Sequence, residues 1–106
     1  MGCIRGLRLA ALLPALLVAA CAAPREPPPG PPVQEMSDAR QALQAARSAG
    51  GAQRFPETFA RALERIQEAE ASLSRGDFRQ ARAAAVSARE QAVAARRAAQ
   101  YIERLE

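Results

Sequence analysis

The fold of this chain is decided by residues 56–105, PETFARALERIQEAEASLSRGDFRQARAAAVSAREQAVAARRAAQYIERL. Apolar residues recur in this stretch at three- and four-residue spacing, which predicts two amphipathic helices. Gly76 is expected to end the first helix in a left-handed conformation, and Asp77 to cap the second, with Gln80 completing a box-like start. Because a turn this short forces the two helices to be antiparallel, the sequence predicts a helical hairpin.

The two helices of the hairpin offer different side chains to the core. Pro56 suits the first turn of the first helix. The apolar stripe of that helix is Phe59, Ala62, Leu63, Ile66, Ala69 and Leu73. The second helix, over residues 78–105, presents a face that is mostly alanine: Ala81, Ala84, Ala85, Ala88, Ala92, Ala95 and Ala99. Such a core buries few large side chains, so we expect marginal stability or stabilisation by a partner.

A further amphipathic helix is predicted before the hairpin, over residues 35–49. Its core positions are Met36, Ala39, Leu43 and Ala46. Gly50-Gly51 is expected to end it. The alanine-rich domain at residues 34–106 is therefore predicted to be all-α: an antiparallel hairpin with this N-terminal helix laid across it, as a small three-helix bundle.

The first 33 residues have a different composition. Arg5 and Arg8 precede an apolar run at residues 9–20, which is typical of a secretory signal peptide. PREPPPGPP at residues 24–32 is typical of an extended, semi-rigid spacer. A transmembrane helix needs about 20 apolar residues, and this run is shorter and contains Pro14. We therefore predict a signal peptide followed by a proline-rich tether.

Met1-Gly2-Cys3 suggests a different anchor, built from a myristoyl and a palmitoyl chain. That signal usually has Ser or Thr at the sixth position, where this chain has Gly6. The myristoyl anchor is therefore the weaker interpretation.

Cys21 directly follows the small pair Ala19-Ala20, and the whole leader resembles a bacterial lipoprotein signal. The resemblance implies cleavage between Ala20 and Cys21, a diacylglycerol on the cysteine sulfur and acylation of the new amine. It also implies the periplasmic face of the outer membrane, because Ala22 stands where an aspartate would signal retention in the inner membrane. The expected divisions are a signal peptide at 1–20, a lipidated cysteine with tether at 21–33 and the helical domain. An ordinary secretory signal and an uncleaved anchor are the alternatives.

The composition restricts the chemistry of the mature chain. The sequence contains no histidine and no lysine, and of its two cysteines, Cys3 and Cys21, only Cys21 would survive cleavage. Loss of Arg5 and Arg8 from the 15 basic residues leaves 13 against 11 acidic ones, a formal charge of +2. Without histidine, lysine or a free thiol, we expect no enzyme, no metal site and no cofactor beyond the lipid on Cys21.

One carboxylate pair, Glu64 and Glu68, shares a face of the first hairpin helix. Such a pair can bind a metal or do acid–base work when it is buried. Arg61 and Arg65 lie beside it, however, and this pattern predicts a solvated, ion-paired surface.

Arg82, Arg89 and Arg96 repeat every seven residues along one edge of the alanine face. This stripe has two interpretations. It can bind an anionic envelope glycolipid or cell-wall polymer. Alternatively, the aliphatic parts of these arginines flank the interface between the helices, and their guanidinium groups pair with glutamates of neighbouring helices. The register of the hairpin places Glu70 near Arg82, which predicts an ion pair between them.

In the antiparallel hairpin, the start of the first helix lies opposite about residue 97 of the second. The last turns of the second helix therefore extend past the first, and they carry Tyr101, Ile102 and Leu105. They either fold back onto Phe55 and the Gly50-Gly51 turn, or form a surface for a protein partner or a second copy. Nucleic acid is not an expected partner, because the chain carries an export signal and few aromatic side chains.

ARQALQAARSAGGAQRFP at residues 39–56 and FARALERIQEAEASLSRGDFRQARAAAVSAREQAVAARRAAQ at residues 59–100 resemble the alanine-rich domain of unknown function found in small bacterial lipoproteins. Relatives often carry a downstream OmpA-like domain that grips peptidoglycan, an activity not expected here. The turn is also similar to one tetratricopeptide hairpin, but a lone repeat cannot bury its face. We expect a lipid-anchored, non-enzymatic envelope protein with a structural or adaptor role. Binding of an anionic envelope ligand is the alternative.

Overall fold

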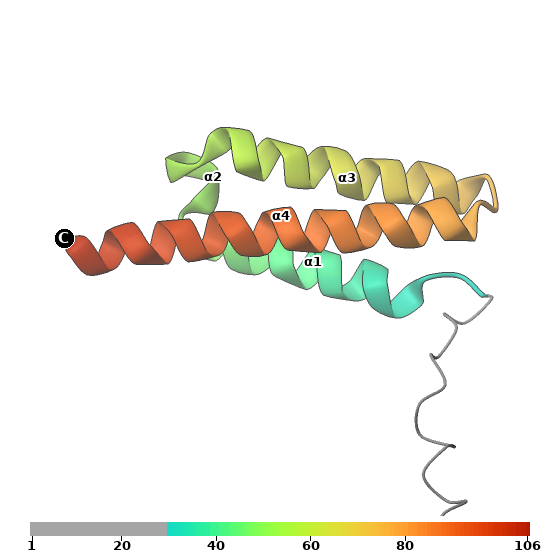
Figure 1. The fold of residues 1–106 in the computed structure, drawn as a ribbon, viewed down its shortest axis with the longest axis horizontal. Coiled ribbons are helices and arrows are strands. Elements are labelled where there is room, and N and C mark those ends of the chain that lie inside the picture. Colours follow the sequence, from blue (N-terminus) through green and yellow to red (C-terminus); the bar gives the residue numbers. More distant parts are fainter. Residues whose placement is uncertain (1–29) are drawn as a thin grey trace, which may run out of the picture.

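A computed structural model describes residues 30–106 of the chain (Figure 1). The predictions for the signal peptide, the cleavage site at Ala20, the lipidated Cys21 and most of the tether lie outside these residues. Within them the regular elements are helices: α1 (Val33–Ser48), α2 (Gly51–Arg54), α3 (Pro56–Ser74) and α4 (Phe78–Leu105). The predicted all-α fold is confirmed.

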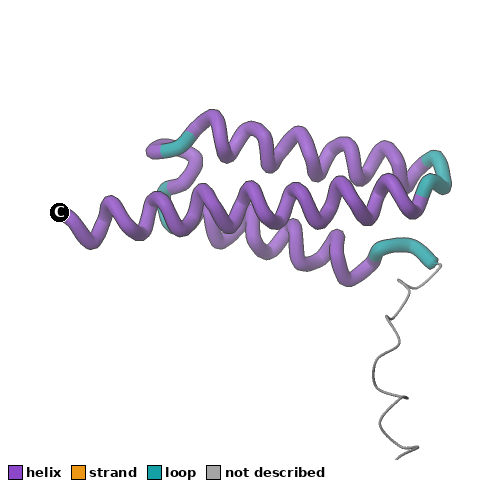
Figure 2. Tube along the Cα trace, viewed as in Figure 1, coloured by secondary structure: helices purple, strands orange, loops and turns teal. Residues whose placement is uncertain are grey.

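The long helix α4 lies at the centre of the bundle. It packs against α3 on one flank and against α1 on the other, while α1 and α3 touch each other much less. Helix α3 runs antiparallel to α4, and α1 runs alongside α4 in the same direction rather than across the hairpin (Figure 1). Figure 2 shows that the turns between the helices lie at the two ends of the bundle.

Gly76 and Asp77 act in the turn between α3 and α4 as predicted, but Gln80 does not complete the predicted box, because its side chain donates to Glu68. Gly76 has a φ of 76°. Its N–H donates to the Leu73 carbonyl at 3.0 Å, and the N–H of Asp77 donates to the Ser72 carbonyl at 2.9 Å. This is the Schellman pattern, which satisfies the last carbonyls of a helix. The Asp77 carboxylate then accepts from the Gln80 N–H at 3.2 Å and so caps α4.

The predicted core positions of α1 and α4 are all buried, including the seven alanines of α4. In α3, Phe59, Ala62, Ile66 and Ala69 are buried, whereas Leu63 and Leu73 are half-buried at the edge of the core. Because alanine side chains are small, they allow α4 to lie close to both of its neighbours. The core is therefore narrow and depends on the larger side chains of α1 and α3.

The link between α1 and α3 differs from the prediction. Gly50 ends α1 with a φ of 83°, as expected, but Gly51 begins the short helix α2. A Cβ on Gly51 would lie 2.9 Å from the Ala46 carbonyl oxygen and 3.4 Å from the Ala95 Cβ. Gly51 is therefore needed for the close approach of α2 to both α1 and α4.

Helix α1 begins at Val33, two residues earlier than predicted. Pro32 is buried, and its carbonyl accepts the first helical hydrogen bond of α1, from Met36 at 3.0 Å. A proline before the first turn loses nothing by lacking an N–H. The end of the proline-rich stretch is thus part of the folded domain.

Candidate interaction surface

The first residue of the predicted arginine stripe, Arg82, is engaged within the fold. Its Nε donates to the Glu35 carboxylate at 3.1 Å, and its terminal nitrogen donates to the Gly30 carbonyl at 2.9 Å. The exposed fractions of the Arg82 and Glu35 side chains are only 17% and 28%. Arg82 therefore ties α4 to the start of α1 and to the residues that lead into it.

The predicted ion pair between Glu70 and Arg82 is wrong. Glu70 is exposed on α3 and pairs with Arg40 of α1 at 3.5 Å. Arg82 leaves α4 on the flank that faces α1, whereas α3 packs on the opposite flank, where Gln80 donates to Glu68 at 2.8 Å. The prediction used only the register of α3 against α4. Helix α1, which it left out, supplies the partner of both Glu70 and Arg82.

Arg89 and Arg96 remain exposed on the α1 side of α4. Both line a surface hollow of about 360 Å³, to which α1 contributes Asp38 and Gln41. Within residues 30–106, the structure shows an ion pair for neither arginine. The two guanidinium groups are therefore available to an external anion, and Arg82 is not.

Helix α4 has the highest net positive charge of the helices in residues 30–106. It contains six arginines and two glutamates, a formal charge of +4, whereas α3 contains two arginines and four glutamates, a formal charge of −2. Arg97, which the seven-residue repeat omits, lines a second hollow together with Arg89 and Val93. A charge count for each helix, rather than a repeat along one edge, would have identified it.

Exposed apolar side chains lie among the arginines of α4. Val86 is 41% exposed and Tyr101 is 62% exposed, and the half-buried Val93 lies between them in sequence. Positions 86, 93, 97 and 101 share one side of a helix with 3.6 residues per turn. The outward face of α4 is therefore basic and apolar together.

The C-terminal end of α4 extends past the other helices (Figure 1). Tyr101 and Leu105 are exposed there, the latter by 70%, while Ile102 is half-buried. Tyr101 and Leu105 do not fold back onto the preceding turn, so the first of the two predicted alternatives is wrong for them. The helix end is instead fastened by an ion pair between Arg54 of α2 and Glu106, at 3.1 Å.

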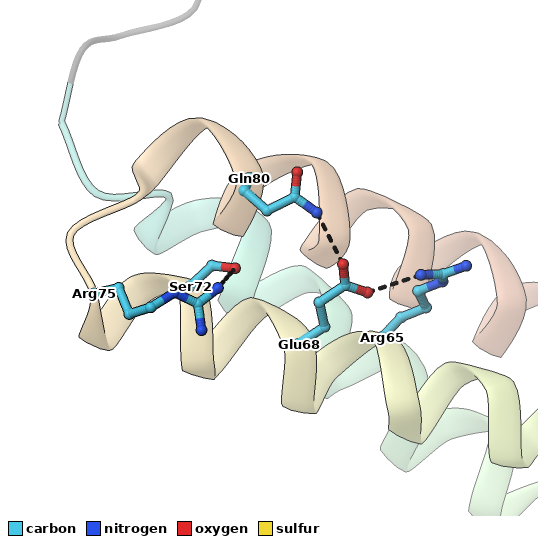
Figure 3. A network of polar contacts seen from close by, with 5 residues as sticks. All are labelled: Arg65, Glu68, Ser72, Arg75 and Gln80. Atoms are coloured by element: carbon cyan, nitrogen blue, oxygen red, sulfur yellow. Dashed lines mark hydrogen bonds and ion pairs between the residues drawn. The ribbon is translucent and has the colours of Figure 1, made fainter.

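The carboxylate of Glu68 belongs to a polar network on the flank shared by α3 and α4 (Figure 3). One oxygen accepts from Arg65 at 2.7 Å and the other from Gln80 at 2.8 Å. Hydrogen bonding from Arg65, followed by that from Gln80, lowers the pKa of Glu68. The predicted ion-paired surface is thus present at Glu68, and its carboxylate is held in the charged form.

Nearby, Arg75 donates to the Ser72 hydroxyl at 3.1 Å. Ser72 is fully buried on α3, a position that the apolar stripe did not predict. Arg75 thus supplies the polar partner that a buried hydroxyl needs.

Within residues 30–106 we find no cluster of acidic, histidine or cysteine side chains that could hold a metal ion. In the same part of the chain, none of the helices has the length and hydropathy that crossing a membrane requires. No family model matches the sequence, and neither a curated protein nor a solved structure shows significant similarity to it.

Proposed function

We propose that this chain is a lipid-anchored, non-enzymatic helical protein of the cell envelope, held at the periplasmic face of the outer membrane by Cys21. Its role is that of an adaptor, which offers helix surfaces to a protein partner or to a second copy of itself. The leader sequence that ends at Cys21 supports the anchor. Stable retention requires more than one acyl chain, which the lipoprotein-type modification supplies.

The observation that carries the adaptor role is the exposed end of α4. Tyr101 and Leu105 are among the few large apolar side chains that the described part of the chain leaves open to solvent. They lie on the last turns of α4, whose C-terminal end extends past the other helices (Figure 1). Exposed apolar clusters of this kind usually mark contact sites, and an exposed ion pair between Arg54 and Glu106 joins the end of this helix to α2.

A non-enzymatic role is supported by the chemistry of the side chains. The sequence has no histidine and no lysine. The carboxylate pair at Glu64 and Glu68 is not set up for proton transfer, because Arg65 and Gln80 occupy both oxygens of Glu68. General acid–base catalysis needs a carboxyl whose pKa lies near the working pH, whereas that of Glu68 is lowered.

Thiol crosslinking in intact envelopes tests the contact surface. The mature, acylated chain would have no free thiol, so Arg104→Cys places a single reactive group beside Tyr101 and Leu105. We expect a maleimide–diazirine crosslinker, which bonds this thiol at one end and inserts into any neighbouring residue on irradiation at the other, to give one discrete adduct. Its mass is about twice that of the chain if the contact is with a second copy. Adding Tyr101→Ser and Leu105→Ser to this variant should abolish the adduct.

The matched control is Ala60→Cys, which places the thiol on the exposed side of α3. The proposal requires that this variant give no discrete adduct. Equal crosslinking at positions 60 and 104, or an adduct that survives loss of Tyr101 and Leu105, would contradict a contact through the end of α4.

A further inference from the structure

We infer that the basic face of α4, centred on Arg89, Val93, Arg96 and Arg97, lies on the anionic head groups of the membrane surface to which the chain is anchored. This inference rests on the proposed anchor at Cys21. It differs from the seven-residue arginine stripe, because Arg82 is withdrawn from the ligand and Arg97 is added to it.

The first support is the uneven distribution of charge. Helix α4 has a formal charge of +4, against −2 for α3. A surface rich in anionic lipid attracts basic residues, and each arginine held near it strengthens binding by about fivefold. The acidic α3 is repelled by the same surface. The charge distribution therefore selects α4 as the side of the bundle that faces lipid.

The second support is the mixture of side chains on this face. Val86 is exposed one turn before Arg89, and Val93 lines both hollows that Arg89 borders. Helices that lie in the membrane interface combine basic residues with apolar and aromatic ones, because the former meet phosphate and the latter enter the acyl boundary. An acidic soluble polymer would gain nothing from the apolar residues.

The third support is the path of the chain toward the anchor. Gly30 is held at the N-terminal end of this face by the hydrogen bond from Arg82 to its carbonyl, at 2.9 Å. Cys21 lies only nine residues before Gly30, which limits their separation to roughly 30 Å. Helix α4 itself is about 42 Å long. A lipid on Cys21 would therefore hold the membrane close to the basic face of α4, which begins just after Arg82.

Arg82 has a distinct part in this arrangement. Because it bonds both Glu35 and Gly30, it fixes where the tether leaves the bundle. The basic face is consequently presented to the membrane in one orientation, with Arg89, Arg96 and Arg97 following along the same helix. Arg82 positions the domain and does not itself meet the lipid.

The test measures protection of a thiol on the α4 face. The full chain carrying Ala94→Cys is reconstituted into vesicles of phosphatidylcholine, with and without phosphatidylglycerol, and is labelled with neutral N-ethylmaleimide. Position 94 lies in the hollow bordered by Arg89 and Arg97. We expect labelling there to slow by about fivefold or more in the anionic vesicles, because Arg89, Arg96 and Arg97 together supply several contacts that each strengthen binding about fivefold. In 1 M salt the protection should disappear.

Control variants on α3 separate protection of the α4 face from a general effect of anionic lipid or of lost positive charge. Ala71→Cys, on the exposed side of α3, should label equally in both kinds of vesicle. Adding Arg89→Gln and Arg96→Gln should remove the protection at position 94. Adding Arg61→Gln and Arg65→Gln, which removes the same charge from α3, should leave it intact.

Equal labelling of position 94 in the two kinds of vesicle would overturn the inference. Protection in native envelopes that is absent from protein-free anionic vesicles would also overturn it, and would assign the face to a protein. The intact mass of the same sample reports the anchor separately. An acylated chain without protection contradicts the lipid-facing surface alone, and an unacylated chain contradicts the anchor alone. Labelling is read on the peptide that contains position 94, so other thiols do not interfere.

Discussion

Arg82 of α4 donates to the carboxylate of Glu35 at 3.1 Å and thereby joins two helices whose contacting residues are 47 positions apart in sequence. Both side chains are largely shielded from solvent. The same guanidinium also holds the Gly30 carbonyl. One side chain therefore joins α4 both to the first turn of α1 and to the residue at which the tether enters the described part of the chain.

Arg82→Met should destabilise the bundle by about 1–2 kcal/mol, because it leaves the Glu35 carboxylate and the Gly30 carbonyl without their donor. Methionine retains most of the apolar stem, so the loss reports the polar contacts. Urea unfolding followed by circular dichroism measures the change. The control is Arg89→Met, which alters an exposed arginine of the same helix and should stay within about 0.5 kcal/mol of wild type. Equal effects of the two substitutions would show that the contacts of Arg82 are not stabilising.

Gly51→Ala should destabilise the protein by up to about 2 kcal/mol. The added Cβ would meet the Ala46 carbonyl oxygen at 2.9 Å, and relieving that clash in a packed core typically costs about 1–3 kcal/mol. The better helix propensity of alanine, about 1 kcal/mol, offsets part of this cost. Thermal unfolding gives the measurement. Gly30→Ala, at a position where a Cβ meets no atom within 4 Å, should leave the melting temperature unchanged.

Ala88→Leu tests whether the alanine face sets the spacing of the helices. Ala88 is fully buried in α4, so three extra carbons must push α4 away from its neighbours at a cost of about 1–3 kcal/mol. Ala94→Leu makes the same change at an exposed position of α4 and should be nearly neutral. A stabilising effect of Ala88→Leu would mean that the core contains unfilled space.

Stability should fall as the pH falls through the acidic range, in part because of Glu68 and Glu106. Hydrogen bonds from Arg65 and Gln80 lower the pKa of Glu68, and the hydrogen bond from Arg54 lowers that of Glu106, relative to the ordinary 4.5. A carboxyl whose pKa is lowered by folding stabilises the native state above its unfolded pKa. That contribution is lost as the pH falls through the folded pKa.

Chemical denaturation at pH 6 and at pH 3 would show this effect. The double variant Glu68→Gln and Glu106→Gln should lose less stability between the two pH values than wild type does. Gln67→Asn, a neutral change on the exposed side of α3, is the control and should retain the wild-type pH dependence. An unchanged slope in the double variant would contradict the assignment.

The local signals in the sequence predicted local structure well. Gly76, Asp77 and Pro56 each act at a helix end through their own backbone or side-chain geometry, and each takes the predicted role. The alanine periodicity likewise predicted the buried face of α4. These features depend on a few adjacent residues, so one sequence is enough to infer them.

The features that sequence reasoning missed depend on three helices at once. The Glu70–Arg82 pair failed because α1 supplies Arg40 to one residue and Glu35 to the other. Helix α2 is a single turn, too short for a periodic pattern to show. At the candidate surface, the distinction between the engaged Arg82 and the exposed Arg89 could not be predicted, since it depends on where α1 begins.

The intact mass of the membrane-extracted protein, for wild type and for Cys21→Ser, tests the lipid anchor most directly. An anchor at Cys21 requires a wild-type chain that lacks residues 1–20 and carries added acyl mass, and a variant without that acyl mass. A wild-type mass without acyl groups, or one that still includes Met1, would contradict a lipid anchor at Cys21.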